Sequence, residues 1–447
     1  MDRLGSDLAK TFCAEPKLHD GVREAGSSVR REVDIFNDQP QQMQQDDVRS
    51  VRPPWPDVPS FSTAAGVASF RCDVLIVGAG ITGAMMAERL TREGHDVVLI
   101  DREQPCRGST AASTAMLLWE IDRPLGQLGS LIGFDRAARC YQASLRAVTE
   151  LKRQISERTL PGELRARQSL YLARDDDSRV LRDELAQRTR AGLPGIFLDH
   201  RTLLDNFGFA RAGAILSPGA ADADPVQLAG GLLSLARSRG AHLVQGNAVF
   251  FDCGKARVTV GLDDGHEIEA RHVVLATGYA IPRIVKPTIH RVTSSWAIAT
   301  VPQPQNLWKD EVLIWEASDD YHYARTTPDG RIIFGGEDDD ELIEPDARDH
   351  AIPEKSRRLA AELSALWPHA ILDTDYQWSG TFDTTDDGLP LIGVVPGYKN
   401  VYGAYGYGGN GITFSYLASE LVATLIGGRS SPLLDDFAIE RSPLGGT

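Results

Sequence analysis

Three glycines and one aspartate in the first quarter of the chain have the types and spacing of a dinucleotide-binding site. Gly78, Gly80 and Gly83 follow the G-x-G-x-x-G pattern, and Asp101 comes 23 residues after Gly78. In such a site the first glycine permits a tight turn, the second lets the backbone approach a pyrophosphate, and the third lets a helix pack closely. The acidic residue accepts a hydrogen bond from a ribose hydroxyl. The alternative is a helix–turn glycine cluster that binds no ligand.

A second group of glycines lies far away in the sequence. Gly406, Gly408, Gly409 and Gly411 come just before an expected terminal helix, Gly411–Ile426. Their bare backbone N–H groups and the positive end of that helix would stabilise negative charge on a bound group. Alone, this run fits a glycine-rich turn equally well. Together with the first glycine group, it favours a site for a cofactor.

A strand, a helix and a second strand are expected to position the first glycine group. The run Asp73–Val77 is short, apolar and β-branched, which is typical of a buried parallel strand. Apolar residues then recur at helical spacing up to Gly94, and a second apolar run, Val97–Ile100, leads to Asp101. A glycine triplet set between two strands and followed by the acid is much more specific than the triplet alone.

Composition limits the classes of partner and compartment. The chain has 447 residues, enough for two or three domains, with 42% hydrophobic and 24% charged residues. Its net charge of −15 argues against nucleic acid or an anionic membrane as a partner. The five cysteines have neither CxxC nor metal-ligand spacing, so we expect reduced thiols, no metal site and a cytoplasmic location. No transmembrane run or secretory signal is visible.

The rest of the chain alternates between helix and strand signals. The expected helices are 136–153, 178–191 with Ser178 as a possible cap, 225–239 capped by Asp224, and 353–366 with Pro353 in the first turn. The expected strands are 168–173, 242–244, 257–260, 267–270, 272–278, 294–301, 311–315, 321–325, 331–335, 389–392 and 401–405. Those from 294 to 335 suggest a mixed or antiparallel sheet.

Two segments fit no regular element. Residues 1–69 are rich in glutamine and proline and poor in aliphatic residues, so we expect a poorly ordered arm. It is either a passive extension or a contact for a partner, and Trp55 and Phe61 are its candidates for local docking. The acidic run Glu337–Glu341 lacks the spacing of a metal-binding loop and reads as a solvated turn.

Four sequence blocks, in this order, resemble the flavin-dependent amine and amino-acid oxidase family, which includes D-amino-acid oxidase, glycine oxidase and sarcosine oxidase. They are the first glycine group with Asp101, then 109–116, then the helix after Asp224 with Val249 and 276–278, and finally 387–393 with 406–413. The resemblance runs from Cys72 to about Gly428. The segments Asp320–Arg325 and Gly330–Gly336 look most like the bacterial branch that includes γ-glutamylputrescine oxidoreductase-like proteins.

The resemblance implies an α/β fold: a Rossmann-like FAD-binding domain interleaved with an α+β substrate domain built on a mixed sheet. The implied FAD domain covers 70–160, 222–288 and 380–430, the substrate domain covers 161–221 and 289–379, and 431–447 form a tail. Carried over by position, the FAD-binding residues are Gly78, Gly80, Ile81, Thr82, Gly83, Asp101, Arg102, Ser109, Thr110, Thr114, Ala115, Met116, Val249, Thr277, Gly278, Tyr407, Gly408, Gly409, Asn410, Gly411, Ile412 and Thr413.

Several positions depart from the family pattern. Phe382 stands where glycine oxidase-like sequences carry the arginine that grips a substrate carboxylate, so glycine or a simple D-amino acid is a poorer expectation. Gly380–Phe382 contains no cysteine for a covalent flavin link, and we expect non-covalent FAD, with Cys106 a remote alternative. Tyr407 replaces a histidine common in the final glycine loop, which removes any role assigned to that histidine.

The remaining candidates for the substrate pocket lie on one expected strand. Tyr321, Tyr323 and Arg325 alternate with His322 and would share one face of the sheet. The tyrosines would form an aromatic wall for an amine, and Arg325 would meet an acidic substrate tail. The same residues also fit cross-strand packing and a surface charge. Trp296, Trp315 and Trp378 are expected in the core.

The resulting hypothesis is oxidation of a C–N bond in an amine or amino acid. Hydride passes to flavin N5, the imine hydrolyses, and oxygen or another acceptor takes the electrons. One alternative is a dehydrogenase of the same fold that reduces a quinone or carrier. Others are a non-catalytic flavoprotein and a hydroxy-acid or polyol phosphate dehydrogenase, although no basic phosphate-binding cluster supports the last. The oligomeric state stays open.

Overall fold

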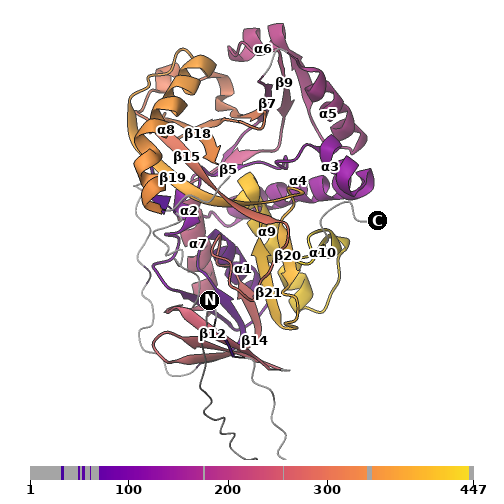
Figure 1. Cartoon of the computed structure of the whole chain (residues 1–447), viewed down its shortest axis with the longest axis vertical. Coiled ribbons are helices and arrows are strands. Elements are labelled where there is room, and N and C mark those ends of the chain that lie inside the picture. Colours follow the sequence, from indigo (N-terminus) through magenta and orange to yellow (C-terminus); the bar gives the residue numbers. More distant parts are fainter. Residues whose placement is uncertain are drawn as a thin grey trace, which may run out of the picture.

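The computed structural model describes residues 32–34, 49–50, 53–55, 61, 70–174, 177–254, 256–339 and 345–441. Two large sheets organise these residues, one in the lower half of Figure 1 and one in the upper half. The first sheet has the order β1-β12-β13-β14-β3-β4-β11, with β21 beside β14 and β20 beside β21. The second has the order β2-β19-β15-β18-β17-β16-β7-β9-β8.

The first sheet is parallel at its centre. Its strands are β1 (Glu32–Asp34), β3 (Phe70–Val77), β4 (Val97–Asp101), β11 (His242–Gln245), β12 (Ala248–Cys253), β13 (Val258–Leu262), β14 (Glu267–Leu275), β20 (Leu391–Val394) and β21 (Val401–Tyr405). β3 pairs in parallel with β4 and β14, and β14 with β21. This arrangement confirms the Rossmann-like half. The two strands expected at 267–270 and 272–278 are a single strand, β14.

Three helices lie against this sheet, with a fourth packed on them. They are α1 (Ile81–Arg92), α7 (Pro225–Ser238), α9 (Gly411–Ile426) and α4 (Phe134–Glu157). α1 buries Ala84, Ala87 and Leu90 in the largest apolar cluster of the described residues, where small side chains let helices approach closely. Asp224 caps α7 by accepting the N–H groups of Val226 and Gln227, as expected.

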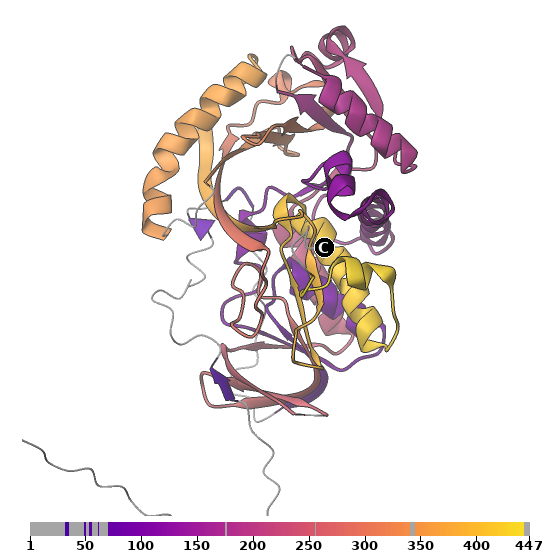
Figure 2. The ribbon, with the colours of Figure 1, turned by 45° about the vertical axis from the view of Figure 1, so that its right-hand side comes forward.

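The second sheet is mixed, as expected. Its strands are β2 (Arg49–Ser50), β7 (Ser169–Ala173), β8 (Ile196–Asp199), β9 (Gly213–Ser217), β15 (His290–Thr300), β16 (Leu313–Ala317), β17 (Tyr323–Thr326), β18 (Ile332–Asp339) and β19 (Thr374–Thr385). All pairs are antiparallel except β16 with β7. Figure 2 shows α8 (Pro345–Leu366) along the outside of this sheet, where Leu359 and Leu363 enter its apolar cluster.

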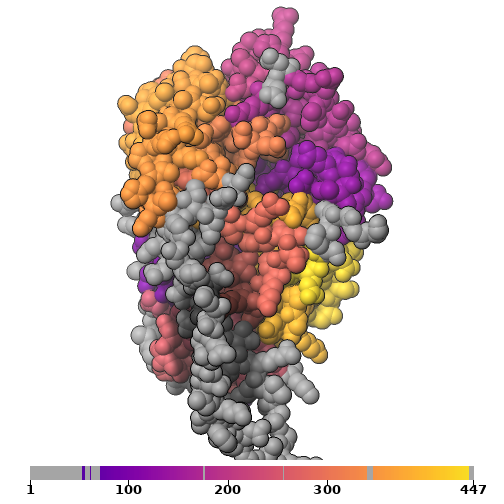
Figure 3. Space-filling model, viewed as in Figure 1, coloured from indigo at the N-terminus to yellow at the C-terminus, as the bar shows by residue number. Residues whose placement is uncertain are grey.

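A small sheet and several short elements complete the described chain. The small sheet is β5 (Met116–Leu117), β10 (Ala221–Asp222) and β6 (Arg165–Ala166). The short elements are α2 (Ser109–Ala112), α3 (Leu125–Ile132), α5 (Arg179–Arg190), α6 (His200–Phe207), α10 (Pro432–Asp436) and the 3₁₀ turns 304–306, 309–311 and 408–410. In Figure 3, magenta and orange segments that are far apart in sequence share the upper end of the molecule.

Some expected element boundaries are wrong. Pro353 lies inside α8, which begins eight residues earlier at Pro345. Ser178 precedes α5, but its side chain makes no capping hydrogen bond. Glu337 and Asp339 belong to β18 and bind Lys355, so this part of the acidic run is not a solvated turn. Residues 340 and 341 lie outside the described part of the chain.

Both ends of the described chain pack on the body. β1 pairs with β12, and β2 pairs with β19. Trp55 Nε1 donates to the carbonyl oxygen of Ser113 at 2.9 Å, and Phe61 is buried in the largest apolar cluster. At the other end, Arg441 binds both carboxylate oxygens of Asp387 at 2.7 Å. The described residues expected in the arm and tail therefore touch the same elements that frame the site.

Candidate active site

The turn between β3 and α1 needs glycine at two positions. Gly78 has φ +106°, and a Cβ there would lie 2.2 Å from the carbonyl oxygen of Ala276. A Cβ on Gly83 would lie 1.9 Å from the carbonyl oxygen of Gly78. Both clashes are with backbone, which cannot move aside cheaply. The turn therefore brings the start of α1 close to the end of β3. The N–H of Ile81 donates to Thr110 Oγ1 at 2.9 Å, and the N-terminus of the helix faces the cavity, where it suits an anion.

Asp101, at the end of β4, holds this turn in place. Its Oδ2 accepts the backbone N–H of Ala79 at 2.7 Å, and its Oδ1 accepts that of Glu103 at 3.0 Å. Burial raises the pKa of its carboxyl group, an effect that these hydrogen bonds and Arg102 oppose. Asp101 also lines the cavity beside the glycine turn, so its carboxylate is placed for the ribose contact expected of it.

The first cavity opens around this turn, between β3, β4 and the strand end at Ala276. Ten of the residues expected to bind FAD line it: Gly78, Gly80, Ile81, Thr82, Asp101, Arg102, Ser109, Thr110, Thr277 and Gly278. Gly83 is not among the lining residues; its missing side chain lets α1 pack closely against the backbone at Gly78. Val249 is not among the lining residues; Gly246, Asn247 and Ala248, just before it, take its place.

The second cavity lies between the final glycine loop and the second sheet. The expected residues that line it are Ser109, Thr114, Met116, Gly408, Gly409, Asn410, Gly411, Tyr321, Tyr323 and Phe382. Ser109 and Tyr279 line both cavities, so the two adjoin. Trp296, Trp315 and Trp378, expected in the core, are largely buried but also line the second cavity. The structure thus joins glycine groups that are more than 300 residues apart in the sequence.

Four of the residues expected to bind FAD line neither cavity and lie in the protein behind the lining residues. Tyr407 is buried in the core beside Thr82 and Ser415, so its ring does not reach the second cavity. Thr413 Oγ1 donates to the carbonyl oxygen of Leu118 at 2.8 Å, which ties the start of α9 to the segment after β5. Ile412 is buried in the same core as Tyr407, and Ala115 is buried between Thr114 and Met116.

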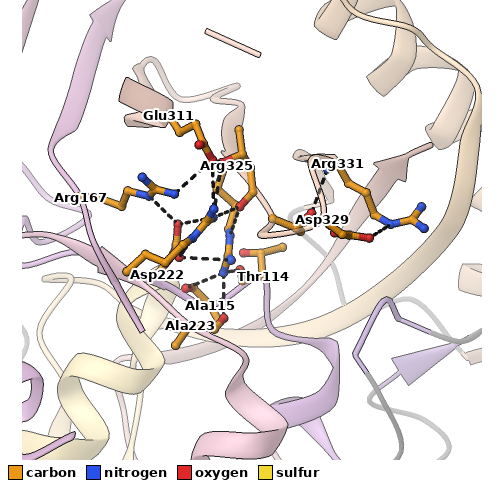
Figure 4. Close-up of polar contacts among 12 residues, drawn as sticks. Thr114, Ala115, Arg167, Asp222, Ala223, Glu311, Arg325, Asp329 and Arg331 are labelled. Carbon is orange, nitrogen blue, oxygen red and sulfur yellow. Dashed lines mark hydrogen bonds and ion pairs between the residues drawn. The ribbon is translucent and has the colours of Figure 1, made fainter. Parts of the chain in front are cut away.

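Arg325 does not join the tyrosines in the second cavity, which corrects its expected role. Its Nη1 donates to the carbonyl oxygens of Thr114, Ala115 and Ala223 at 2.9 to 3.0 Å (Figure 4). Its Nη2 lies 3.5 Å from Asp222. Burial lowers the pKa of Arg325 to about 10, which leaves it charged at neutral pH. A guanidinium held in this way has no capacity to grip the acidic tail of a substrate.

The tyrosines do form an aromatic wall. Tyr321 and Tyr323 lie with ring centroids 6.2 Å apart, and Tyr321 precedes β17, which begins at Tyr323. Trp315 stacks on Tyr171 with centroids 3.8 Å apart and also faces the cavity. Burial raises the pKa of both Tyr321 and Tyr323, so their hydroxyl groups stay protonated.

Asp383 holds the final glycine loop through hydrogen bonds to its backbone, and His290 in turn binds Asp383. Asp383 accepts the backbone N–H groups of Gly406 and Tyr407 at 2.8 and 3.0 Å. Its Oδ2 lies 2.9 Å from Nε2 of His290. β19 and β15, the longest pair in the second sheet, carry these two side chains. The loop that begins α9 is therefore set by the second sheet.

Two carboxyl groups lie close to the second cavity. Asp122 lines it, and its Oδ2 accepts the backbone N–H of Gly409 at 2.8 Å. Burial, together with the charge of Asp338, raises the pKa of Asp122 to about 6. Burial also raises the pKa of Asp338, although the nearby hydroxyl groups of Ser295 and Tyr321 oppose the shift. No arginine, lysine or histidine belongs to the described lining of this cavity.

Sequence reasoning missed four of these groups: Asp122, Tyr279, Asp338 and Asp383. Asp338 lies inside the acidic run Glu337–Glu341, whose composition predicts a turn. The other three residues occur singly, in segments with no motif spacing. Asp383 was one residue from a position singled out at Phe382. These residues come close to one another near the second cavity only because strands that are far apart in the sequence pair in the folded chain.

Neither a metal centre nor a membrane-spanning helix occurs among the described residues. Within the described ranges, no group of three or more His, Cys, Asp or Glu side chains is arranged to hold a metal ion. No helix in the same ranges is both long and apolar enough to cross a membrane.

Comparisons with known proteins bear on the cofactor. A family model of FAD-dependent oxidoreductases matches residues 73–425. γ-Glutamylputrescine oxidoreductase of Escherichia coli (strain K12) is 23% identical over 386 residues, which cover 83% of this chain and 87% of that protein. Glycine oxidase of Pseudomonas aeruginosa is 25% identical over 384 residues, which cover 81% of this chain and 96% of that protein.

A solved structure is similar over almost the same region. Glycine oxidase from Geobacillus kaustophilus has a TM-score of 0.70 and 21% identity, with 84% of this chain and 100% of that chain covered. This likeness shows a shared fold. Together the comparisons confirm the family resemblance and FAD as the cofactor. The chain therefore belongs to the FAD-dependent oxidoreductase family.

Proposed function

We propose that this FAD-dependent oxidoreductase oxidises the C–N bond of an amine that carries no carboxylate on its reacting carbon. The substrate loses a hydride from carbon and a proton from nitrogen and becomes an imine, which water converts to a carbonyl compound and ammonia or an amine. Bound FAD supplies the electron sink for the two electrons of the hydride. Oxygen, or another two-electron acceptor, then takes these electrons.

The lining of the second cavity carries this proposal. Recognition of a carboxylate next to the reacting carbon uses a paired cation, most often a bidentate arginine. Phe382 stands at the position expected for that arginine and lines the cavity. The described lining contains no basic side chain, and its one charged residue is Asp122. Such a cavity repels carboxylates and suits an amine.

The residues of the chain would serve to bind and orient both partners. Tyr321, Tyr323 and Phe382 present apolar faces to the carbon chain of the substrate. The N-terminus of α9 favours negative charge at the cofactor end of the cavity, while the N–H of Gly409 is already taken by Asp122. Asp383 fixes the position of that loop.

We further propose that FAD is held without a covalent bond. Cys106 is the one cysteine among the described lining residues of the two cavities. Burial, with the nearby charge of Asp101, raises the pKa of its thiol to about 12. A thiol rather than a thiolate is a poor nucleophile at neutral pH. Denaturation in acid should release all of the flavin into the supernatant.

The test is anaerobic reduction of the FAD-loaded protein by a panel of primary, secondary and N-methyl amines and amino acids. Amines should bleach the oxidised-flavin absorbance, and glycine or D-alanine should do so poorly. Air is then admitted: hydrogen peroxide, one per flavin reoxidised, identifies an oxidase. A reduced flavin that only a quinone reoxidises identifies a dehydrogenase. A flavin that no amine reduces contradicts the proposal.

A further inference from the structure

We propose that Asp122 and Asp338 form a subsite for a second, cationic group of the substrate, which makes the substrate a diamine or a longer polyamine. This inference rests on the proposed amine oxidation and names its substrate class. The nitrogen that is oxidised must be neutral, because its lone pair assists loss of hydride from the neighbouring carbon. A second nitrogen that stays protonated needs a separate place to bind.

Asp122 presents an anionic face to the second cavity. Its side chain is accessible from the cavity, while the protein around the cavity keeps bulk water away from it and so raises its pKa. Its Oδ2 accepts the N–H of Gly409, and its Oδ1 receives a long hydrogen bond, 3.3 Å, from Nδ2 of Asn410. A carboxylate has about four acceptor positions, so Asp122 retains capacity for an ammonium group.

Asp338 lies on β18, on the side of the cavity formed by the second sheet. The hydroxyl groups of Ser295 and Tyr321 lie close enough to its carboxylate to lower its pKa, against the larger effect of burial. Its Oδ1 is buried and has no hydrogen-bond partner. A buried acceptor without a partner costs free energy that a bound donor would recover, and an ammonium group offers three donors. Tyr321 lines the cavity and its hydroxyl lies close to Asp338, so the acid is one side chain away from the open space.

A second buried acceptor in the same region, the side-chain oxygen of Asn410, has no hydrogen-bond donor among the described protein groups. Asn410 is buried and lines the second cavity. Its Nδ2 donates to the carbonyl oxygen of Glu120 at 2.9 Å and toward Asp122, which fixes the orientation of the amide. Its Oδ1 is left without a partner. Asn410 Oδ1 is thus a second buried acceptor, in addition to Asp338 Oδ1, that has no donor in the described part of the chain.

Among the described residues, the two basic side chains that act on Asp338, Lys355 and His322, are bound to other acids. Asp338 contributes to the raised pKa of Asp122, so the two carboxyl groups repel each other. The nearest lysine, Lys355, donates to Asp339 at 3.0 Å and to the carbonyl oxygen of Glu337 at 2.7 Å. His322, which also acts on Asp338, lies 3.2 Å from Glu316. A cation over the tyrosine faces would gain further attraction from their π systems.

The experiment compares matched amines on the FAD-loaded full chain. Anaerobic flavin reduction is measured against concentration for α,ω-diamines of three to six carbons and for the n-alkylamines of the same lengths. One diamine should reach half-saturation at a concentration at least about tenfold lower than its monoamine, as expected for one charge-assisted contact. Asp338→Asn should remove most of that difference between each diamine and its matched monoamine.

Asp320→Asn is the control variant, because Asp320 is an exposed acid just before Tyr321 and does not line the cavity. It should keep the full preference for diamines. Equal half-saturation of the wild-type protein by every matched pair overturns the subsite, whether or not Asp338→Asn folds, and leaves the proposed function standing. A preference for diamines that survives in both Asp338→Asn and Asp122→Asn also overturns it. Absence of reduction by any amine contradicts the proposed function instead.

Discussion

Arg325 donates a hydrogen bond of 3.0 Å to the carbonyl oxygen of Ala115, a residue with φ +54°. This left-handed conformation is uncommon outside glycine and costs free energy unless its surroundings hold it. Arg325 also binds the carbonyl oxygens of Thr114 and Ala223. The segment that lines the second cavity is therefore held from behind by a buried cation.

Replacement of Arg325 by methionine should destabilise the protein and reduce its FAD content. The change removes the Arg325 donor from three carbonyl groups, of which Ala115 keeps only a long bond of 3.4 Å from the N–H of Ala223. It also removes a cation near Asp222, and a loss of about 3–5 kcal/mol is expected for a buried charge network. Thermal unfolding and the ratio of flavin to protein measure the two effects. Arg331→Met is the control, because Arg331 binds Asp329 and the carbonyl oxygen of Thr300, away from Ala115 (Figure 4), and its loss should leave the FAD content unchanged. Equal effects of the two changes would contradict the role of Arg325.

Replacement of Asp383 by asparagine should loosen the final glycine loop. An asparagine side chain has one acceptor oxygen, whereas Asp383 accepts Gly406 on one oxygen and Tyr407 on the other. Loss of one charge-assisted hydrogen bond should weaken FAD binding by about tenfold or more. The reduction potential of the flavin should shift as well, which a merely structural defect would not cause in the folded, FAD-loaded fraction.

The matched control for Asp383 is Asp386→Asn, since Asp386 is exposed and pairs with Arg291. Fluorescence titration of the apoprotein with FAD gives both affinities. Unchanged affinity and potential in Asp383→Asn would show that the loop does not depend on this carboxylate.

Binding of a cationic amine should weaken as pH falls through about 6. Burial and Asp338 raise the pKa of Asp122 to about 6, and the N–H of Gly409 opposes that shift. Above this pH Asp122 is ionised and attracts the cation, and below it the carboxyl group is neutral. Half-saturation concentrations for a diamine should therefore rise in acid, and Asp122→Asn should remove the inflection. The rate of reduction at saturation should still increase with pH, because the reacting nitrogen must be neutral.

Replacement of Asp101 by alanine should weaken FAD binding. The change removes the acceptor for Ala79 in the glycine turn and the carboxylate expected to meet the ribose. We expect at least a tenfold increase in the dissociation constant for about 1.4 kcal/mol lost. A variant that binds FAD with full affinity would contradict both roles of Asp101.

The local parts of the fold could be predicted from sequence. Glycine spacing reports backbone geometry within a few residues, so β3, α1 and β4 were found, and the expected bounds of α9 match those observed. β19 was not predicted. Its sequence, TDYQWSGTFDTT, mixes polar residues with a glycine, and its stability comes from pairing with β15 along its whole length.

The substrate end could be predicted only in part, because it depends on contacts between distant segments. Tyr323 and Arg325 alternate on one strand, as expected, but carbonyl groups from Thr114 and Ala115 capture the arginine. Asp122 and Asp338 come from segments that share no motif, and only the closure of the second sheet over the glycine loop brings them near one cavity. The spacing of residues along the sequence does not indicate which distant side chains lie close together in the fold.

Anaerobic titration of the FAD-loaded protein with an amine tests amine oxidation most directly. The oxidised-flavin absorbance is followed while the carbonyl product is quantified. We predict complete bleaching by at least one amine without a carboxylate, with one carbonyl group formed per flavin reduced. A protein that retains FAD, is reduced by dithionite and yet is bleached by no amine, or only by α-amino acids, would contradict the proposed function.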